Sequence, residues 1–511
     1  MAHLRSRRTR AIALPAGLAL TASLGFMPAG AASAVSLDDS TPAAVATDGP
    51  KLSYVVNTHG GHSTAKAVKR AIAKAGGTVV IAYDQIGVIV VHSQNPDFAR
   101  QIRAVKGVAS AGATRTNPLA PQTDTAIDAE QPLGTAEAAE AAARATGDQD
   151  PLEPLQWDLP AIKADKAHQK TLGSKKVTVA VIDTGVDDTH PDLAPNFDVE
   201  ASANCVSGAP DTTPGSWRPA AGESDHGTHV AGTIAAAKND VGVTGVAPGV
   251  KVSGIKVANP DGFFYTESVV CGFVWAAEHG VDVTNNSYYT DPWLFACKTD
   301  EDQKALLESV TRAAKYAERK GAVNVAAAGN SRMDLAANEL TDTTSPNDTT
   351  PVTRVINPRE CLDYPTMLPG VVTVSATGAK GLKSSYSNYG HGNIDISAPG
   401  GDSTAYQKPD APATSGLILS TVMNGGYGYK AGTSMASPHV AGVAALIKST
   451  HPRASAAEVK ALLYAQADDT ACGAPYDING DGTVDAVCEG GKGKNGFYGT
   501  GLTDALDAVR R

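Results

Sequence analysis

Between residues 51 and 118, short apolar runs alternate with stretches of helical periodicity. The apolar runs predict strands, which start near Leu52, Thr78 and Val88 and just after Gly107. The periodic stretches 63–75 and 96–105 predict amphipathic helices. The resulting order β-α-β-β-α-β is typical of a small α+β unit with the split βαβ, or ferredoxin-like, arrangement.

Residues 119–150 break this pattern. They are rich in Ala, Thr, Pro, Asp and Glu and hold few large apolar residues besides Leu133. Such a composition predicts an exposed acidic linker, the kind of segment that proteases cut. The run 136–146 could form a solvated helix, but nothing in the pattern requires one.

From residue 151 to residue 511 the pattern is strand, loop, helix. Continuous β-branched runs predict strands covered on both faces, and they lie at 177–182, 281–284, 322–326 and 371–374. Helical periodicity lies between them at 267–279 and 302–320. This alternation predicts an α/β domain with a mostly parallel central sheet.

The composition supports more than one folded unit in a chain of 511 residues, with 42% hydrophobic residues and 51 glycines. The net charge of −10 and the absence of a long basic run argue against nucleic-acid binding. Residues 51–118 are basic, however, with nine Lys or Arg against only Asp84 and Asp97. Because the remaining chain is acidic, the two parts are expected to dock.

The first 34 residues have the order of a secretory signal peptide. A start rich in arginine precedes the apolar run 11–27, and Ala32-Ser33-Ala34 offers a cleavage site. The alternatives are a membrane anchor and, from the pair Arg7-Arg8, twin-arginine export; the general secretory route fits better. Later stretches are too short to span a membrane, so we expect a soluble, secreted mature protein.

Six cysteines agree with an oxidising compartment. Their even number favours disulfides, although six cysteines allow fifteen pairings. Cys472 with Cys488 is the pairing that the spacing favours most, and Cys297–Cys361 and Cys205–Cys271 are weaker inferences.

Three polar residues stand at the ends of apolar elements. Ser434 lies in a glycine-containing turn before a long apolar helix, where the helix dipole and unpaired N–H groups stabilise an anion. His226 opens a second helix of small residues, and Asp183 ends a buried strand just before Gly185. Each residue alone has a structural explanation: an N-cap serine, a core histidine or a turn aspartate. A metal site at His226 and His229 lacks a suitable third ligand.

The residues that flank Asp183, His226 and Ser434 in the sequence decide between these structural explanations and a catalytic role. The segments Asp183-Thr-Gly-Val-Asp, His226-Gly-Thr-His-Val-Ala-Gly-Thr and Gly432-Thr-Ser-Met-Ala-Ser-Pro-His resemble the active-site signatures of the subtilisin-like serine proteases, or subtilases. Their order along the chain is also that of the subtilisin triad. Framework segments resemble the same family over residues 155–508. The resemblance implies a subtilisin-like three-layer α/β fold and an Asp183–His226–Ser434 triad that cleaves peptide bonds without a cofactor.

The resemblance also implies further residue roles. Ala326-Ala-Ala-Gly-Asn330 resembles the strand that carries the oxyanion-hole asparagine. The expected substrate-binding residues are Ser287, Tyr288, Tyr289, Gly262, Phe264, Ala328 and Gly329. Aromatic residues replace glycines that the family often has there, which suggests a narrowed cleft and a selective processing protease as the alternative to a broad degradative enzyme.

The family's precursor organisation gives the expected domains. These are a signal peptide (1–34), an inhibitory propeptide domain (35–118), a linker with the maturation cleavage (119–150) and a peptidase domain (151–511). The expected partners are protein or peptide substrates and the chain's own propeptide, and we expect a monomer without nucleic-acid or membrane contacts.

Residues 477–485 have the D-x-N-x-D-G-x-x-D order of a calcium loop. Asp477, Asn479, Asp481 and Asp485 are the candidate ligands for a structural calcium ion. Position twelve of the loop is Cys488 where a bidentate Glu is usual, so an Asx-rich turn closed by a disulfide is the alternative.

Two other function classes have less support. A catalytically inactive peptide-binding relative has no support, because the triad residues and Asn330 are present. An esterase of the α/β-hydrolase type would need a G-x-S-x-G elbow and the order Ser, Asp, His, and Ser434 has neither.

Overall fold

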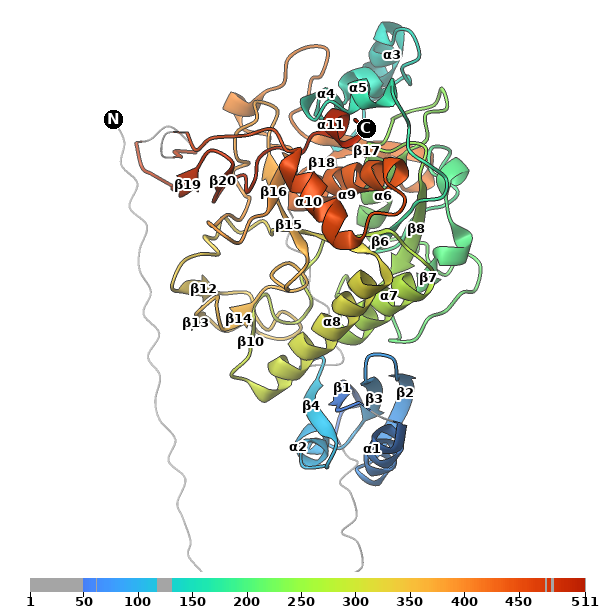
Figure 1. Cartoon of the computed structure of the whole chain (residues 1–511), viewed down its shortest axis with the longest axis vertical. Helices are drawn as coiled ribbons and strands as arrows, with labels where there is room; N and C mark the ends of the chain where they lie inside the picture. The colour runs from blue at the N-terminus through green and yellow to red at the C-terminus, as the bar shows by residue number, and fades with distance from the viewer. Residues whose placement is uncertain (1–48, 61, 117–130, 474–475, 479–481, 511) are drawn as a thin grey trace, which may run out of the picture. The chain divides into compact units, whose positions relative to one another are not determined.

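The structure is a computed structural model that describes residues 49–60, 62–116, 131–473, 476–478 and 482–510. The predicted signal peptide lies outside these described residues. Figure 1 shows the described helices and strands with the labels used below.

The first described elements form the predicted small α+β unit. Their order is β1 (Leu52–Thr58), α1 (His62–Lys74), β2 (Gly77–Tyr83), β3 (Val88–Ser93), α2 (Phe98–Arg103) and β4 (Val108–Ala113). The strands pair antiparallel in the order β2-β3-β1-β4, which confirms the β-α-β-β-α-β prediction. Alternate side chains of β1 and β3 face opposite ways: Val56 packs with Ile72 and Phe98 of the two helices, whereas Val55 packs with the large domain.

A parallel sheet forms the centre of the large domain. In the described part of the chain it has seven strands in the order β16-β15-β11-β9-β6-β8-β7. The bounds are β6 (Thr178–Asp183), β7 (Ala203–Asn204), β8 (Lys251–Lys256), β9 (Val283–Asn286), β11 (Val323–Ala327), β15 (Val372–Thr377) and β16 (Ile396–Pro399). Every neighbouring pair runs parallel, as the β-branched runs predict.

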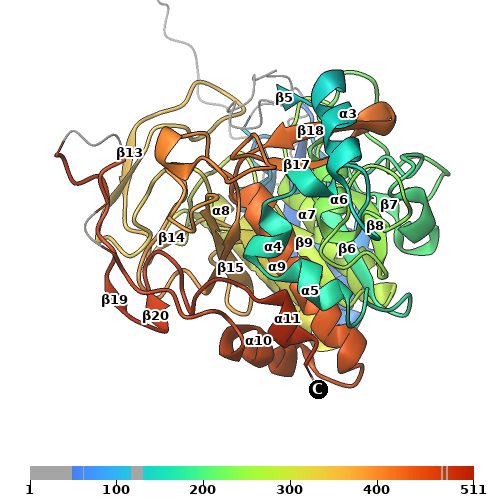
Figure 2. The same ribbon diagram turned by 90° about the horizontal axis from the view of Figure 1, so that it is seen from above.

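Helices cover both faces of this sheet (Figure 2). Val179 and Val181 of β6 pack into the cluster with α6 (His226–Ala235) and α9 (Thr433–Thr450). Ala180 and Ile182 point the other way, into the cluster with α7 (Thr266–Glu278) and α8 (Glu301–Lys320). The architecture is therefore the expected three-layer α/β fold, and α7 and α8 agree with the predicted helices to within one residue.

Helix α8 shows why the ends of such helices can be predicted from the sequence. The side chain of Asp300 accepts the N–H of Gln303 at 2.9 Å, which caps the first turn. Gly321 ends the helix with φ +109°, a left-handed conformation that favours glycine.

The second half of the predicted linker differs from the prediction. Strand β5 (Gln131–Pro132) pairs with β18 (Gly426–Lys430), and α3 (Thr135–Arg144) follows it. Ala141 of α3 is buried in a cluster with Leu417 and Tyr429. Most side chains of 131–150 are exposed, as the composition predicts, but the segment is folded and docks through a few small apolar side chains. Residues 117–130 lie outside the described residues.

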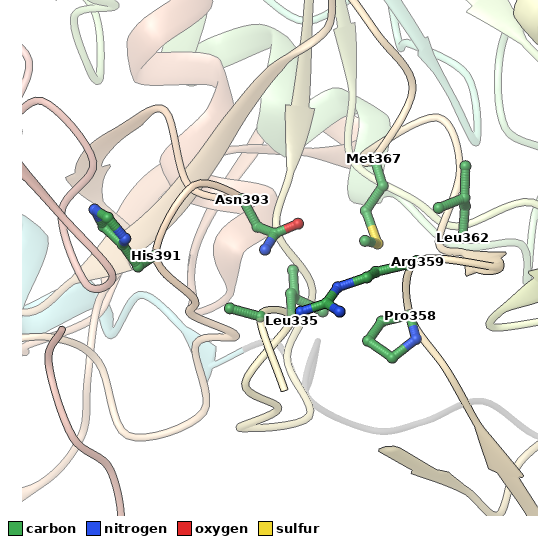
Figure 3. Close-up of a pocket in the computed structure, with 8 residues that line it drawn as sticks. Leu335, Pro358, Arg359, Leu362, Met367, His391 and Asn393 are labelled. Carbon is green, nitrogen blue, oxygen red and sulfur yellow. The ribbon is translucent and has the colours of Figure 1, made fainter. Parts of the chain in front are cut away.

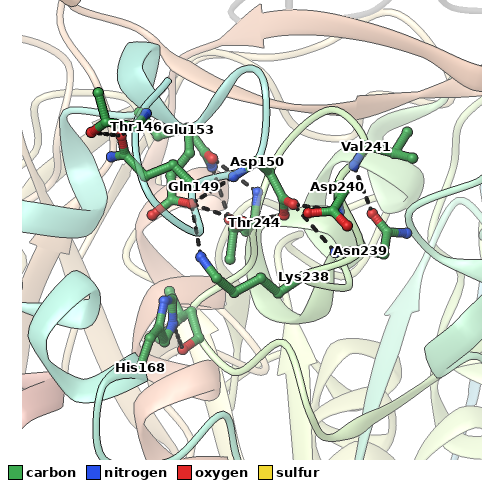
Figure 4. Close-up of polar contacts among 12 residues, drawn as sticks. Thr146, Gln149, Asp150, Glu153, His168, Lys238, Asn239, Asp240, Val241 and Thr244 are labelled. Atoms are coloured by element: carbon green, nitrogen blue, oxygen red, sulfur yellow. Dashed lines mark hydrogen bonds and ion pairs between the residues drawn. The ribbon is translucent and has the colours of Figure 1, made fainter. Parts of the chain in front are cut away.

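Polar contacts anchor the chain where this segment ends (Figure 4). Asp150 is buried, and its carboxylate accepts the N–H of Asp240 at 2.8 Å. Glu153 pairs with Lys238 at 3.1 Å. These contacts tie the start of the large domain to the loop that follows α6.

The remaining short elements lie around the large sheet. They are α4 (Asp158–Ala161), α5 (Ala164–His168), β10 (Ala296–Cys297), β12 (Leu340–Asp342), β13 (Arg354–Ile356), β14 (Cys361–Leu362), β17 (Ile418–Val422), α10 (Ala456–Ala465), β19 (Gly490–Gly491), β20 (Lys494–Asn495) and α11 (Ala505–Ala508). Among the described helices, none combines the length and the apolar character that crossing a membrane requires.

All six cysteines form disulfides. The pairs are Cys205–Cys271, Cys297–Cys361 and Cys472–Cys488. The three pairings that the spacing favours are therefore confirmed.

Candidate active site

Three neighbouring strands of the parallel sheet deliver the candidate residues to one edge. Asp183 is the last residue of β6, β9 continues into Ser287, and β11 continues into Ala328, Gly329 and Asn330. Strand β9 pairs with both β6 and β11. Because parallel strands end at the same edge, their carboxyl ends meet where open α/β sheets bind ligands.

Asp183 and His226 form a buried hydrogen-bonded pair. The Nδ1 atom of His226 lies 2.7 Å from Oδ1 of Asp183, and both side chains are almost fully buried. A carboxylate can only accept here, so Nδ1 carries the proton and Nε2 is the nitrogen with basic character. The pair is possible because α6 approaches β6 closely: a Cβ on Gly227 would lie only 2.3 Å from the carbonyl oxygen of Gly185.

Ser434 lies in the first turn of α9, which packs against α6. Its hydroxyl donates to the carbonyl of Ser287 at 3.2 Å. Pro438 lies inside the helix and has no N–H to offer the carbonyl of Ser434 four residues earlier. The hydroxyl of Ser287 replaces the missing donor at 3.1 Å.

Asn330 is fixed by its contacts with Thr433. Its Oδ1 accepts the backbone N–H of Thr433 at 2.8 Å and the Thr433 hydroxyl at 2.9 Å, which leaves Nδ2 as the donor on the other side of the amide. Nδ2 of Asn330 and the backbone N of Ser434 both lie 3.5 Å from the point where a Cβ on Gly432 would stand. Two nitrogen donors therefore lie near the same point at the start of α9.

His229 lies one turn further along α6 than His226. It is fully buried, and its Nε2 donates to the carbonyls of Ile418 and Gly428 at 3.1 and 3.2 Å. Burial, with a contribution from nearby Lys430, lowers its pKa to about 3. His229 is thus a neutral structural residue.

The two segments expected to border the substrate lie against each other. The ring of Phe264 stacks on that of Tyr288 at 4.6 Å, and the Tyr288 hydroxyl donates to Asn286 at 2.9 Å. Tyr288 is only 8% exposed, so its ring fills the space behind the segment. Tyr289 accepts a hydrogen bond from Asn347 at 2.8 Å. Gly262 forms a turn with φ +88° before Phe264.

Sequence reasoning missed Asp363, which follows β14 and lies beside Gly329. Its Oδ2 atom is 3.6 Å from the position that a Cβ on Gly329 would take. Asp363 is 2% exposed, and burial raises the pKa of its carboxyl well above the ordinary range. The segment Cys361-Leu-Asp-Tyr-Pro shows a carboxylate next to an apolar stretch, but it does not show that the carboxylate is buried.

A separate cavity of about 330 Å³ contains none of the triad residues. Figure 3 shows the Arg359 guanidinium reaching toward Leu335 across it. The lining residues are Leu335, Ala336, Pro358, Arg359, Leu362, Met367, His391 and Asn393.

The predicted calcium loop is only partly described. Asp477 accepts the N–H of Gly482 at 2.8 Å, and Asp485 accepts the N–H of Ile478 at 2.7 Å. Asn479 and Asp481 lie outside the described residues. Within the described part of the chain, no group of three or more His, Cys, Asp or Glu side chains is arranged to hold a metal ion.

A parallel α/β sheet with a serine, a histidine and an aspartate at its carboxyl edge defines the class of serine hydrolases to which this site corresponds. The model of the "Subtilase family" matches residues 174–501, and the chain belongs to that family. The protein is thus a subtilisin-like serine endopeptidase that acts on proteins or peptides, and such catalysis requires no cofactor.

Curated relatives agree with this assignment. Subtilisin BL of Lederbergia lenta is 32% identical over 356 residues, which make up 70% of this chain and 99% of that protein. M-protease of Shouchella clausii (strain KSM-K16) is 31% identical over 356 residues, or 70% of each chain.

Solved structures resemble the chain beyond the peptidase domain. The epidermin leader peptide processing serine protease (EpiP) of Staphylococcus aureus has a TM-score of 0.63 and 25% identity, and the match covers 90% of this chain and 99% of that one. A lanthipeptide protease has a TM-score of 0.51 and 26% identity over 70% of this chain and 95% of its own.

Proposed function

We propose that the protein is a secreted endopeptidase that processes its own precursor and uses Asp183, His226 and Ser434 as a catalytic triad, with Asn330 in the oxyanion hole. The 2.7 Å contact between Asp183 and His226 carries this proposal, because it orients the imidazole at the same sheet edge as Ser434. The export signal that the first 34 residues resemble supports secretion.

The mechanism follows from these positions. Nε2 of His226 takes the proton of the Ser434 hydroxyl as Oγ attacks the peptide carbonyl, and Asp183 stabilises the resulting imidazolium. Nδ2 of Asn330 and the N–H of Ser434 hold the oxyanion. His226 then protonates the leaving amine, which leaves an acyl-enzyme on Ser434. Water, deprotonated by His226, attacks this ester and releases the acid and the free serine.

A serine-directed covalent inhibitor tests the assignment. It should label Ser434 and abolish proteolysis, and Ser434→Ala should be neither labelled nor active. Labelling of another serine in the active protein would contradict the triad. Activity should also fall in acid as His226 becomes protonated, so full activity at strongly acidic pH would argue against His226 as the base.

We also propose that the small α+β unit inhibits the peptidase before maturation. Its contacts with α8 support this role: Asn57 donates to the carbonyl of Ala305 at 2.9 Å, and Arg312 donates to the carbonyl of Thr58 at 2.9 Å. Arg103 pairs with Glu301 and Asp302 at the start of α8. These contacts agree with the expected docking of a basic unit on an acidic domain.

The maturation cleavage is proposed to fall between Thr116 and Gln131. Thr116 is held by Asp348, and Gln131 is paired with Tyr429 of β18. Cleavage is expected in the peptide bonds between these two contacts, because neither contact shields them. The mature enzyme would therefore keep β5 and α3.

Selective processing of substrates is proposed over broad degradation. The likeness to EpiP, a protease named for leader-peptide processing, supports this choice. A peptide-library profile with a strong preference at one or more positions is the expected result, and a profile as broad as that of a digestive protease would contradict it. The active form is proposed to be a monomer, which its mass in solution tests.

A further inference from the structure

Asp363 is a buried carboxylate without a hydrogen-bond or ion-pair partner among the described residues. It is 2% exposed, its Oδ1 has no hydrogen-bond partner, and no ion pair reaches it from the described residues. Burial alone raises the pKa of its carboxyl well above the ordinary value. A buried carboxylate is costly unless something pairs with it, so such a group is characteristic of a binding site.

Other buried carboxylates in this protein have partners. Glu267 pairs with Arg115, and Asp342 pairs with Arg354. Asp192 accepts the N–H of Val243 and the hydroxyl of Tyr427, each at 3.0 Å. The fold therefore satisfies comparable groups elsewhere, and Asp363 stands apart from them.

Asp363 lies beside Gly329, the residue that precedes Asn330. Its Oδ2 is 3.6 Å from the place where a Cβ on Gly329 would stand, and Gly329 itself has no side chain to cover it. The hydroxyl of Thr366 donates to the carbonyl of Ala327 at 2.8 Å and holds the turn after Asp363 against the end of β11. After burial and Asp291, the charge of Asp363 also contributes to raising the pKa of Tyr289, so the carboxyl lies within electrostatic range of the extension of β9.

This position is the one that a substrate side chain must pass. If Asn330 and Ser434 hold the carbonyl that is attacked, the side chain of that same substrate residue starts within a few bonds of Asn330. Residues 328–330 and 287–289 extend from the neighbouring strands β11 and β9. Asp363 then lies at the far end of the path past Gly329, where a long side chain would present its terminal group.

We propose that Asp363 selects substrates with Arg or Lys at the residue whose carbonyl Ser434 attacks. A guanidinium or an ammonium group brings both the positive charge and the N–H donors that the buried carboxylate lacks. This assignment rests on the proposed triad, and it adds a substrate class to it. The carboxylate binds the substrate and takes no part in the proton transfers.

Peptides that differ only at this residue test the proposal. We expect kcat/KM to be about 100-fold higher with Arg than with citrulline, which has nearly the same shape without the charge. Lys should be accepted, and Phe should be cleaved poorly. Equal rates for Arg and citrulline would overturn the proposal without any mutation. If the wild-type enzyme cleaves no peptide at all, the proposed triad itself fails, and the two failures are thus distinguishable.

A pair of variants ties the preference to Asp363. Asp363→Asn should lower kcat/KM for the Arg peptide about 100-fold and change the Phe peptide much less. Asp192→Asn removes a carboxylate that is equally buried but bonded within the protein, and it should leave the ratio of Arg to Phe unchanged. Rates are normalised to the fraction of Ser434 that a covalent inhibitor labels. An Arg to Phe ratio that survives Asp363→Asn would overturn the role of this residue.

Discussion

At the scale of single residues, Ser287 connects two parts of the site. Pro438 deprives the Ser434 carbonyl of its helical hydrogen bond, and the Ser287 hydroxyl supplies the missing donor at 3.1 Å. In return, the Ser434 hydroxyl donates to the Ser287 carbonyl. The extension of β9 is therefore fastened to the start of α9, so the backbone expected to contact substrate and the nucleophile hold one another in place.

Asn330 offers a test of the oxyanion hole at this scale. Asn330→Ala should lower kcat by about 10²–10³-fold and change KM little, because the lost N–H acts on the charge that develops in the transition state. Single-turnover acylation measures the effect.

Asn330→Asp is the matched comparison for that variant. It keeps oxygen acceptors for Thr433, which Asn330 contacts through Oδ1, but it removes the N–H donor. A large loss of acylation rate in both variants indicates that the N–H donor of Asn330 is required. A wild-type acylation rate in Asn330→Asp would show that only the contact with Thr433 matters.

The residues that could be predicted are those whose role is indicated by the sequence immediately around them. Asp183, His226 and Ser434 each lie in a recognisable segment, and the structure brings Asp183 and His226 together. Asp363 could not be predicted, because its importance depends on burial next to Gly329, 34 residues earlier, and on the absence of a partner among the described residues. Similarly, the stacking of Phe264 on Tyr288 could not be predicted, because a sequence does not give the direction of a side chain.

At the scale of elements, periodicity sufficed where an element has its own strong pattern. Helices α7 and α8, the strands of the small sheet and strands β6, β9, β11 and β15 follow their hydrophobic runs, whereas β7, β8 and β16 were not predicted. The docking of α3 could not be predicted from periodicity, because its buried residue, Ala141, is small and its partners Leu417 and Tyr429 lie nearly 300 residues away. Composition described this segment correctly as polar, but it could not reveal the surface that receives it.

The loop 477–485 carries a prediction of its own. If its carboxylates hold a structural calcium ion, removing divalent cations with a chelator should lower the melting temperature, and added calcium should restore it. Asp485→Asn should reduce this calcium-dependent shift, while the disulfide Cys472–Cys488 stays in place. A melting temperature that does not change on chelation would leave the disulfide-closed turn as the explanation of the motif.

At the scale of the whole molecule, one buried ion pair links the small α+β unit to the large domain. Glu267 of α7 is almost fully buried and pairs with Arg115, whose guanidinium also lies 4.0 Å from the ring centre of Tyr265. Burial alone would raise the pKa of Glu267, but Arg115 and several hydrogen bonds outweigh it and hold the pKa below the ordinary value. Stability from this contact is therefore complete above the ordinary carboxyl pKa and is lost as the pH falls through the lowered one.

Arg115→Ala tests this link in an uncut Ser434→Ala precursor. The variant leaves the Glu267 charge buried without its cation, at a cost of about 3–5 kcal/mol. Hydrogen exchange in the first turn of α7 should therefore become faster at neutral pH, and the difference from the parent should shrink in acid. Arg100→Ala is the control, because among the described residues Arg100 pairs with the exposed Asp97 inside the small unit, and it should not alter exchange in α7.

The position and route of the maturation cleavage form the last prediction. We expect the N-terminus of the secreted enzyme to lie within 117–131, with α3 retained, and N-terminal sequencing measures it. Residues 117–130 contain no Lys or Arg, so this cut does not use the charge of Asp363. An intramolecular reaction tolerates this because the cleaved bond and Ser434 belong to one chain, which gives a high effective concentration. Its rate should therefore not depend on protein concentration, and added wild-type enzyme should not cut the Ser434→Ala precursor at the same bond. An N-terminus beyond Arg144 would contradict the retention of α3 and place the cleavage on the far side of that helix.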